Sequence, residues 1–266
     1  MKLSRAVAAV VTAVSLAVLG ATTGAATTAT PVVTHSAKPT IVLVHGASED
    51  GSAWNGVTAR LQKAGYTVVV PAPPLRGVAS DSAYVASLLK TITGPKVLVG
   101  HSYGGMIISE VAAELPDVTA LVYAAALIPQ PGESLQSLVS LYPGSLFGAA
   151  ARTVDYAGGT DVYVDPGQFR DVFADDRSPS DAALTAAAQR PIAASATTEA
   201  ATRAAPAGIP KYVLVATEDH AIPPAAERFM ARRANAWTVE VRSSHDLPTS
   251  HPDAVAGVIE KAAARP

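Results

Sequence analysis

The stretch of residues 97–113 constrains the fold of this chain more than any other. Residues 97–99 are apolar and typical of a short buried strand, and residues 106–113 have the apolar spacing of a helix. Between them, residues 100–104 read Gly-His-Ser-Tyr-Gly and match the pattern G-x-S-x-G. In a strand–turn–helix context this pattern predicts a strained turn that presents the hydroxyl of Ser102 as a nucleophile. Glycines flank the serine because side chains two positions away would clash in such a turn.

The composition indicates one large domain with a sizeable core. Of the 266 residues, 49% are hydrophobic and 16% are charged, and the formal net charge is −2. A chain with so little net charge is not expected to bind nucleic acid or an anionic surface. It contains no cysteine, which excludes disulfides, thiol catalysis and thiolate metal sites.

The N-terminus has the pattern of a signal peptide, which we place at residues 1–26. Lys2 and Arg5 precede an apolar segment, residues 6–19, and small residues near the end offer a cleavage point. The apolar segment is shorter than the roughly 20 residues that a membrane-spanning helix needs. We therefore expect a secreted protein without a stable membrane anchor, with a Thr/Ala-rich linker at residues 27–39.

After the linker, apolar strands alternate with helices at short intervals. Strands are expected at residues 40–45, 66–70, 96–99, 117–123, 211–216 and 237–241. The alternation predicts βαβ units, and therefore an α/β fold with a mostly parallel sheet flanked by helices. The core of this fold comprises residues 40–128 and 207–266.

Residues 129–206 interrupt the alternation. They contain several aromatic residues among prolines and glycines, show no strong strand pattern, and become alanine-rich and helical at residues 180–190. An insertion of this size between sheet elements predicts a helical cap, or lid, over the site. The alternative is a peripheral helical subdomain with no role at the site.

A serine nucleophile needs a base within reach and a carboxylate that orients the base. We assign the acid to Asp219, which follows the strand at 211–216, with Glu218 and Asp246 as less favoured alternatives. We assign the base to His245, which follows the last strand. Because parallel strands end along one edge of the sheet, these loops are expected to converge near Ser102. The order Ser, Asp, His is that of α/β-hydrolases.

His35 is interpreted as a solvated residue of the linker, and the four histidines that remain besides His245 are given structural roles. His251 begins the C-terminal helix, His220 follows the acid too closely to face it, His101 packs behind the turn, and His45 stabilises the loop after the first strand.

The oxyanion of a tetrahedral intermediate needs two hydrogen-bond donors. The Tyr103 N–H, at the start of the helix, is one candidate. The Ala47 N–H, in the loop after the first strand, is the other.

These motifs resemble the α/β-hydrolase superfamily from about residue 40 to the C-terminus. The resemblance is carried by Val-His-Gly-Ala at 44–47, Gly-His-Ser-Tyr-Gly-Gly at 100–105, Thr-Glu-Asp at 217–219 with Ile-Pro at 222–223, and His245 with Ser-His-Pro at 250–252. Within the superfamily, the chain is similar to the esterase branch that contains plant methyl esterases and hydroxynitrile lyases. The resemblance implies the triad Ser102, Asp219 and His245, the oxyanion donors Ala47 and Tyr103, and a cap at residues 129–206.

Two departures argue against cyanohydrin cleavage. Hydroxynitrile lyases of this branch carry threonine where this chain has Gly46, and lysine where it has Asp246. Epoxide hydrolases and haloalkane dehalogenases carry aspartate at the turn, so Ser102 argues against both activities. Cofactor-free haloperoxidases share the triad, so their activity stays open.

The sequence thus predicts a secreted serine hydrolase that cleaves carboxylic esters through an acyl-enzyme, without metal or cofactor. Lactone or amide hydrolysis and perhydrolysis on the same triad are alternatives, as is a ligand-binding protein that turns over slowly.

We expect the substrate to be a small molecule, a neutral, apolar ester of short to medium length, because the insertion has no basic cluster. The expected pocket residues are Leu75, Leu146, Phe147, Phe169 and Phe173. The oligomeric state is left open.

Overall fold

The computed structural model describes residues 38–264. The predicted signal peptide, residues 1–26, and residues 27–37 of the linker lie outside the described residues. No helix within the described range is long and apolar enough to cross a bilayer.

A six-stranded sheet forms the centre of the described unit, with the order β2-β1-β3-β4-β8-β9 and parallel pairing throughout. The strands are β1 Thr40–Val44, β2 Val68–Val69, β3 Lys96–Ser102, β4 Val118–Ala126, β8 Lys211–Ala216 and β9 Trp237–Val241. The four central strands are almost entirely buried, as expected for parallel strands covered on both faces. The predicted α/β fold is confirmed.

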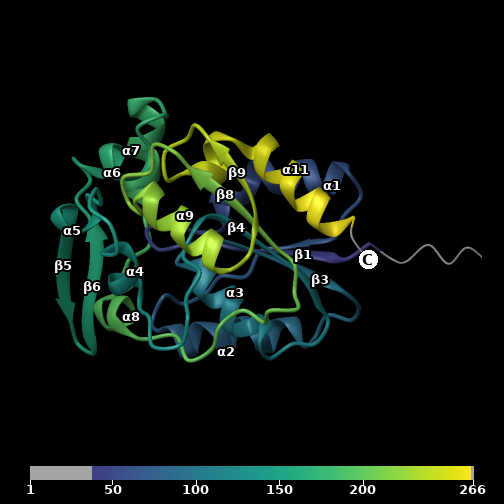
Figure 1. The fold of residues 1–266 in the computed structure, drawn as a ribbon. Helices are drawn as coiled ribbons and strands as arrows, with labels where there is room; N and C mark the ends of the chain where they lie inside the picture. The colour runs from purple at the N-terminus through teal and green to yellow at the C-terminus, as the bar shows by residue number, and fades with distance from the viewer. Residues whose placement is uncertain (1–37, 265–266) are drawn as a thin grey trace, which may run out of the picture. The chain divides into compact units, whose positions relative to one another are not determined.

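Helices cover both faces of this sheet (Figure 1). Along β1, Ile41 and Leu43 pack toward one helical layer, and Val42 and Val44 toward the other, because side chains alternate along a strand. The first layer holds α1 Asn55–Lys63 and α11 Pro252–Ala263; the second holds α2 Val78–Leu89, α3 Gly104–Ala112 and α9 Pro224–Arg233. A short 3-10 helix, η1 Gly51–Trp54, and α10 Leu247–Ser250 complete the core.

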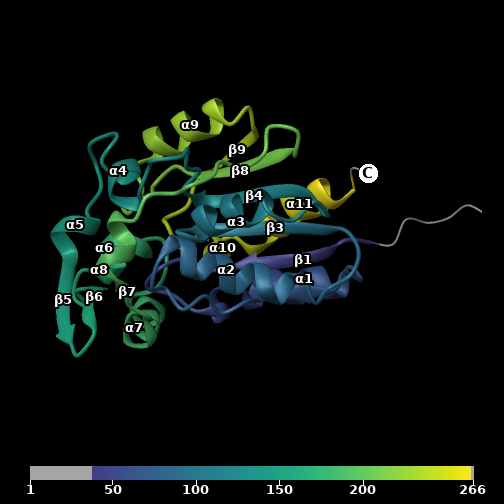
Figure 2. The same ribbon diagram turned by 90° about the horizontal axis from the view of Figure 1, so that it is seen from below.

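The cap gathers at one end of the sheet, as seen most clearly from below (Figure 2). Its elements are α4 Leu135–Val139, α5 Phe147–Ala150, β5 Ala151–Tyr156, β6 Gly159–Val164, α6 Phe169–Phe173, α7 Pro179–Ala188, β7 Ile192–Ala193 and α8 Ala194–Thr198. Ser178 caps α7 by accepting a hydrogen bond from the Asp181 N–H, and Pro179 occupies the first turn. This helix matches the one expected at residues 180–190.

The prediction of a helical cap needs one correction, because β5, β6 and β7 form a three-stranded antiparallel sheet. Every residue of β5 is exposed. Since neither face of this strand is buried, its sequence needs no alternation of apolar and polar residues. The available signal was the turn at residues 157–158, where Gly158 has a φ of 125° that favours glycine. In β6, Val162 and Val164 are buried and attach the hairpin to the cap.

Candidate active site

The predicted nucleophile lies on the turn between β3 and α3. Ser102 has a φ of 52°, a left-handed conformation that is strained for a residue with a side chain. A Cβ on Gly100 would lie 2.7 Å from the backbone of Gly104, and one on Gly104 would lie 2.4 Å from the Val44 carbonyl oxygen. Both positions therefore require glycine, and this packing holds the serine at the end of the strand.

His245 and Asp219 form a buried pair at the same edge of the sheet. Nδ1 of His245 donates to Oδ2 of Asp219 at 2.6 Å, and neither side chain is exposed. The other oxygen of Asp219 accepts from the N–H groups of Ala221 and Ile222, each at 2.7 Å. Because the carboxylate fixes the proton on Nδ1, Nε2 is left as an acceptor, and it has no hydrogen-bond partner among the described residues.

A small cavity of about 20 Å³ brings the nucleophile and the base together. Its volume suffices for about one water molecule. The lining combines both predicted reacting groups with apolar side chains of the core and the cap: Ala47, Ser102, Leu127, Leu135, Val139, Phe147, Phe173, Ala221, Ile222 and His245. We refer to it as the reaction chamber.

The two expected oxyanion donors lie next to the chamber. Ala47 lines the chamber, and Tyr103 is the N-cap of α3. Neither backbone N–H donates to an acceptor among the described residues. The hydroxyl of Tyr103 donates to Asp81 at 3.0 Å, which anchors this residue beneath the turn. His45 bonds the carbonyl of Gly46 through Nδ1 at 2.9 Å, and burial lowers the pKa of His45, so the imidazole there is neutral.

The alternative acids and bases are engaged elsewhere. Glu218 pairs with Arg242 at 2.7 Å, and Asp246 pairs with Arg177 at 2.7 Å. Nδ1 of His220 donates to the carbonyl of Asp171 at 2.9 Å. His251 lies 3.6 Å from Asp176.

A buried carboxyl group behind Asp219 was not singled out by the sequence. Burial, together with the charge of Asp219, raises the pKa of Glu227 well above its usual value. Burial thus favours the protonated form of Glu227, and Asp219 is the carboxyl group that bonds His245. A glutamate within a helix offers no local pattern that reveals such a position.

The expected substrate-binding residues divide into two groups. Phe147 and Phe173 line the chamber, whereas Leu75, Leu146 and Phe169 do not. Leu75 is fully buried in the core, Leu146 is 42% exposed at the surface, and Phe169 stacks on Phe173 at 5.1 Å between ring centroids. These three residues do not contact the chamber, because apolar character does not reveal which neighbour a side chain meets, and their role in binding stays a prediction. The chamber residues missed by the sequence analysis are Leu127, Leu135, Val139, Ala221 and Ile222.

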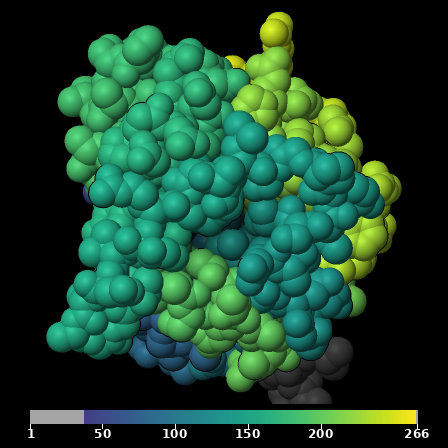
Figure 3. Space-filling view, turned by 90° about the vertical axis from the view of Figure 1, so that its left-hand side faces the viewer, coloured from purple at the N-terminus to yellow at the C-terminus, as the bar shows by residue number. Residues whose placement is uncertain are grey.

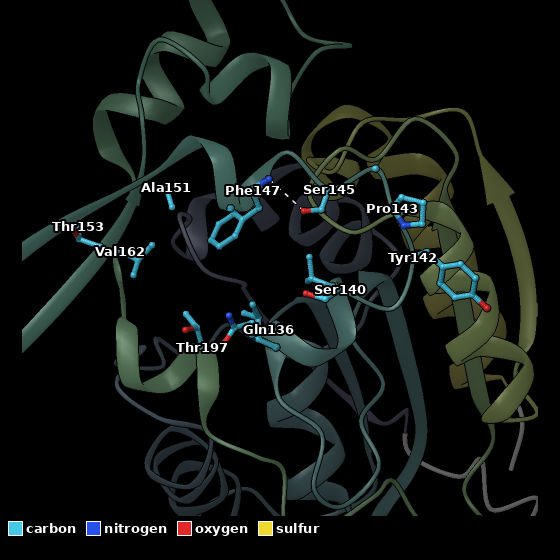
Figure 4. Close-up of a pocket in the computed structure, with 14 residues that line it drawn as sticks. Gln136, Ser140, Tyr142, Pro143, Ser145, Phe147, Ala151, Thr153, Val162 and Thr197 are labelled. Carbon is cyan, nitrogen blue, oxygen red and sulfur yellow. Dashed lines mark hydrogen bonds between the residues drawn. The ribbon is translucent and has the colours of Figure 1, made fainter.

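A larger cavity of about 450 Å³ opens beside the chamber. It shares Leu135, Val139 and Phe147 with the chamber, and we call it the vestibule. Figure 4 shows the Phe147 ring turned into the vestibule between Ser140 and Val162. The remaining lining residues are Gln136, Ser140, Tyr142, Pro143, Gly144, Ser145, Gly148, Ala151, Thr153, Val162 and Thr197. None of these lining residues, all in the described part of the chain, carries a charge, and the surface is hollowed over the cap (Figure 3).

The sequence model of the alpha/beta hydrolase family matches residues 41–258. The chain belongs to this family. The alpha/beta hydrolase nvfD of Aspergillus novofumigatus is 30% identical over 251 residues, which cover 85% of this chain and 97% of that protein. The carbendazim hydrolyzing esterase of Nocardioides sp. is 34% identical over 111 residues, or 37% of this chain. The chain spans only 46% of the length of that esterase.

Among solved structures, a methylesterase from Arabidopsis shares the fold, with a TM-score of 0.70 and 20% identity. The match covers 84% of this chain and 98% of the methylesterase. The resemblance of this alpha/beta hydrolase to plant methyl esterases is thereby confirmed in its fold. Gly46, where hydroxynitrile lyases carry threonine, is closely packed, because a Cβ there would lie 2.6 Å from the Cβ of Ser102. A threonine would therefore require the serine to shift.

Proposed function

We propose that this protein is a serine hydrolase of small, neutral carboxylic esters, with Ser102 as nucleophile, His245 as base and Asp219 as the orienting acid. The observation that carries the proposal is the Asp219–His245 pair: His245 lines the same chamber as Ser102, and its Nε2 has no hydrogen-bond partner in the part of the chain that the structure describes. Membership in the family, and relatives named as esterases, support ester cleavage.

The reaction follows from this arrangement. His245 Nε2 takes the proton of Ser102 as the oxygen attacks the acyl carbon, and Asp219 stabilises the imidazolium. The N–H groups of Ala47 and Tyr103 bind the oxyanion. The imidazolium then protonates the departing alcohol, and a water deprotonated by His245 releases the acid from the acyl-enzyme.

The two cavities indicate the shape of the substrate. The chamber of about 20 Å³ leaves room only for a small group at the reacting carbonyl, whereas the vestibule of about 450 Å³ can hold the larger half of the ester. The uncharged lining favours neutral esters, since a carboxylate would lose its hydration without gaining a partner. We therefore expect activity on esters with one short and one long half.

The test uses p-nitrophenyl esters of increasing acyl length, methyl esters of the same acids, and a p-nitrophenyl succinate half-ester. In the methyl series, each methylene that fits should gain about 0.8 kcal/mol, or about fourfold in kcat/KM, until the vestibule is full. Labelling of Ser102 by an organophosphonate identifies the nucleophile. Preference for the half-ester, or no response to chain length, would contradict the substrate class, and tight ligand binding without turnover would contradict the enzyme.

We also propose that residues 1–26 are a signal peptide and that the protein is secreted. The support is the pattern of Lys2, Arg5 and the apolar segment at residues 6–19. N-terminal sequencing of protein from the culture medium should find a start between about residues 25 and 38. Intact Met1 on protein found only in the cytoplasm would reject secretion.

A further inference from the structure

A second buried histidine lies directly behind the reaction chamber. Nδ1 of His101 is 2.8 Å from Oε2 of Glu49, and its Nε2 is 2.8 Å from the carbonyl oxygen of His245. The side chains of His101 and Glu49 are 0% and 2% exposed. The rings of His101 and His245 are 4.8 Å apart between centroids.

The direction of these bonds is fixed by their acceptors. A carbonyl oxygen only accepts, so Nε2 of His101 carries a proton and donates to His245. Burial acts to lower the pKa of His101, but Glu49 outweighs it and raises this pKa to about 9. Burial likewise opposes ionisation of Glu49, yet contact with His101 lowers the pKa of Glu49. The pair is therefore charged at neutral pH, with both ring nitrogens of His101 donating.

This pair joins three segments that are distant in sequence. Glu49 lies in the loop of the oxyanion donor Ala47, two residues further on. His101 precedes the nucleophile Ser102. The accepting carbonyl belongs to His245 itself, so its backbone is held at the residue whose side chain bonds Asp219.

We propose that Glu49 and His101 are positioning residues, which hold the oxyanion loop, the nucleophile turn and the His245 loop in register for the reaction. The inference rests on the proposed function. Neither side chain lines the reaction chamber or the vestibule, so both act through the residues they hold. Displacement of a reacting group by about 1 Å can cost about 100-fold in rate, so loss of this pair should reduce kcat far more than it changes KM.

The first test compares two substitutions of one residue. Glu49→Ala should lower kcat about tenfold or more, with KM within about twofold. Glu49→Gln should keep kcat within about threefold, because its amide N–H can donate to Nδ1 and leave the proton on Nε2 for the His245 carbonyl. Wild-type kcat in Glu49→Ala would overturn the proposal, as would an equal loss of kcat in both variants.

The second test separates positioning from stability. The double variant Glu49→Ala with His101→Phe removes both partners and leaves no unpaired buried charge, so stability should recover relative to His101→Phe alone. Its kcat should stay low, because the bond to His245 is still missing. A double variant with wild-type kcat would show that the pair only stabilises the fold.

Glu110 provides the matched control. It is a buried acidic residue of α3 that accepts hydrogen bonds from Thr202 and Arg203, and none of its side-chain hydrogen bonds within residues 38–264 reaches the three segments. Glu110→Ala should lower the unfolding temperature and leave kcat unchanged. Ser102→Ala, measured alongside, tests the proposed function separately. An active Ser102→Ala variant refutes the proposed function. An inactive Ser102→Ala variant, together with a wild-type kcat in the Glu49→Ala variant, refutes only the positioning role.

Discussion

Two segments of the cap contact the active site in different ways. The clamp segment, residues 171–177, is bonded to the loop that carries His245. Asp176 accepts a hydrogen bond from the Ser244 N–H at 3.1 Å. Asp246 forms an ion pair with Arg177 at 2.7 Å, and its N–H donates to the Phe173 carbonyl at 2.8 Å. The vestibule segment, residues 135–164, forms the wall of the larger cavity, and its strand β5 is exposed along its length.

This difference indicates that the two segments of the cap have different roles. The Phe173 ring lies edge-on to the His245 ring, with 4.8 Å between centroids. The clamp segment therefore helps to hold the proposed base in place. The vestibule segment contacts the loop after Asp219 through few bonds, such as Leu146 N to the His220 carbonyl at 2.7 Å. We expect substitutions in the clamp segment to change kcat and those in the vestibule segment to change substrate preference.

The largest loss of turnover should come from substitution of the nucleophile, and it is the reference for the effects of substitutions in both segments. Ser102→Ala should lower turnover by about three orders of magnitude or more while the protein stays folded, because attack and acyl transfer are both lost. Steady-state kinetics on the best ester and a circular dichroism melt provide the measurement. More than about a tenth of wild-type activity would reject Ser102 as the nucleophile.

The clamp segment should give the next largest effect. Asp176 accepts from the hydroxyls of Ser244 and Ser250 at 2.6 and 2.9 Å, from the Ser243 hydroxyl at 3.2 Å and from the Ser244 N–H, so Asp176→Ala removes the acceptor of four donors. We expect kcat to fall about tenfold and stability to fall by about 1–3 kcal/mol.

The matched control is Asp155→Ala in the vestibule segment, where the exposed carboxylate accepts only from Thr160 among the described residues. Its kcat should equal that of the wild type. Equal kcat values in Asp176→Ala and Asp155→Ala would contradict the proposed difference between the two segments.

A third prediction concerns the ion pair between the clamp segment and the His245 loop. Burial, together with the nearby charge of Glu49, raises the pKa of Asp246 to about 6 despite its bond to Arg177. Since this folded-state pKa lies above the ordinary value of 3.8, the folded protein binds the proton more tightly than the unfolded chain. The resulting stability is fully present below about pH 4 and is lost as the pH rises through about 6.

Urea unfolding of the wild type and of Asp246→Asn across pH 4–7.5 measures this effect. The free energy of unfolding of the wild type, relative to the variant, should decrease as the pH rises. A constant or increasing difference would show that Asp246 is ionised throughout this range.

The parts of the molecule that were predictable are those with local patterns. The strands, the turn at Ser102 and the order of Asp219 and His245 follow from apolar runs, glycine spacing and the convergence of parallel strand ends. The ion pair of Glu49 with His101 spans 52 residues, and no local pattern reveals it. Likewise, Phe169 and Phe173 look alike in the sequence, yet only Phe173 lines the chamber, because the fold determines which neighbour each ring meets.

The smallest effect should come from the wall between the two cavities. Phe147 lines both the chamber and the vestibule, and its ring is 6.3 Å from that of Phe173 between centroids. Phe147→Ala should join the two spaces, so kcat/KM for esters with two long halves should rise by roughly three- to tenfold relative to short esters. Leu146→Ala is the control, since its side chain is 42% exposed and lines neither cavity, and it should leave this ratio unchanged. If Phe147→Ala lowers kcat for all esters equally, Phe147 supports the reacting groups as the clamp segment does, and the two segments are not functionally distinct.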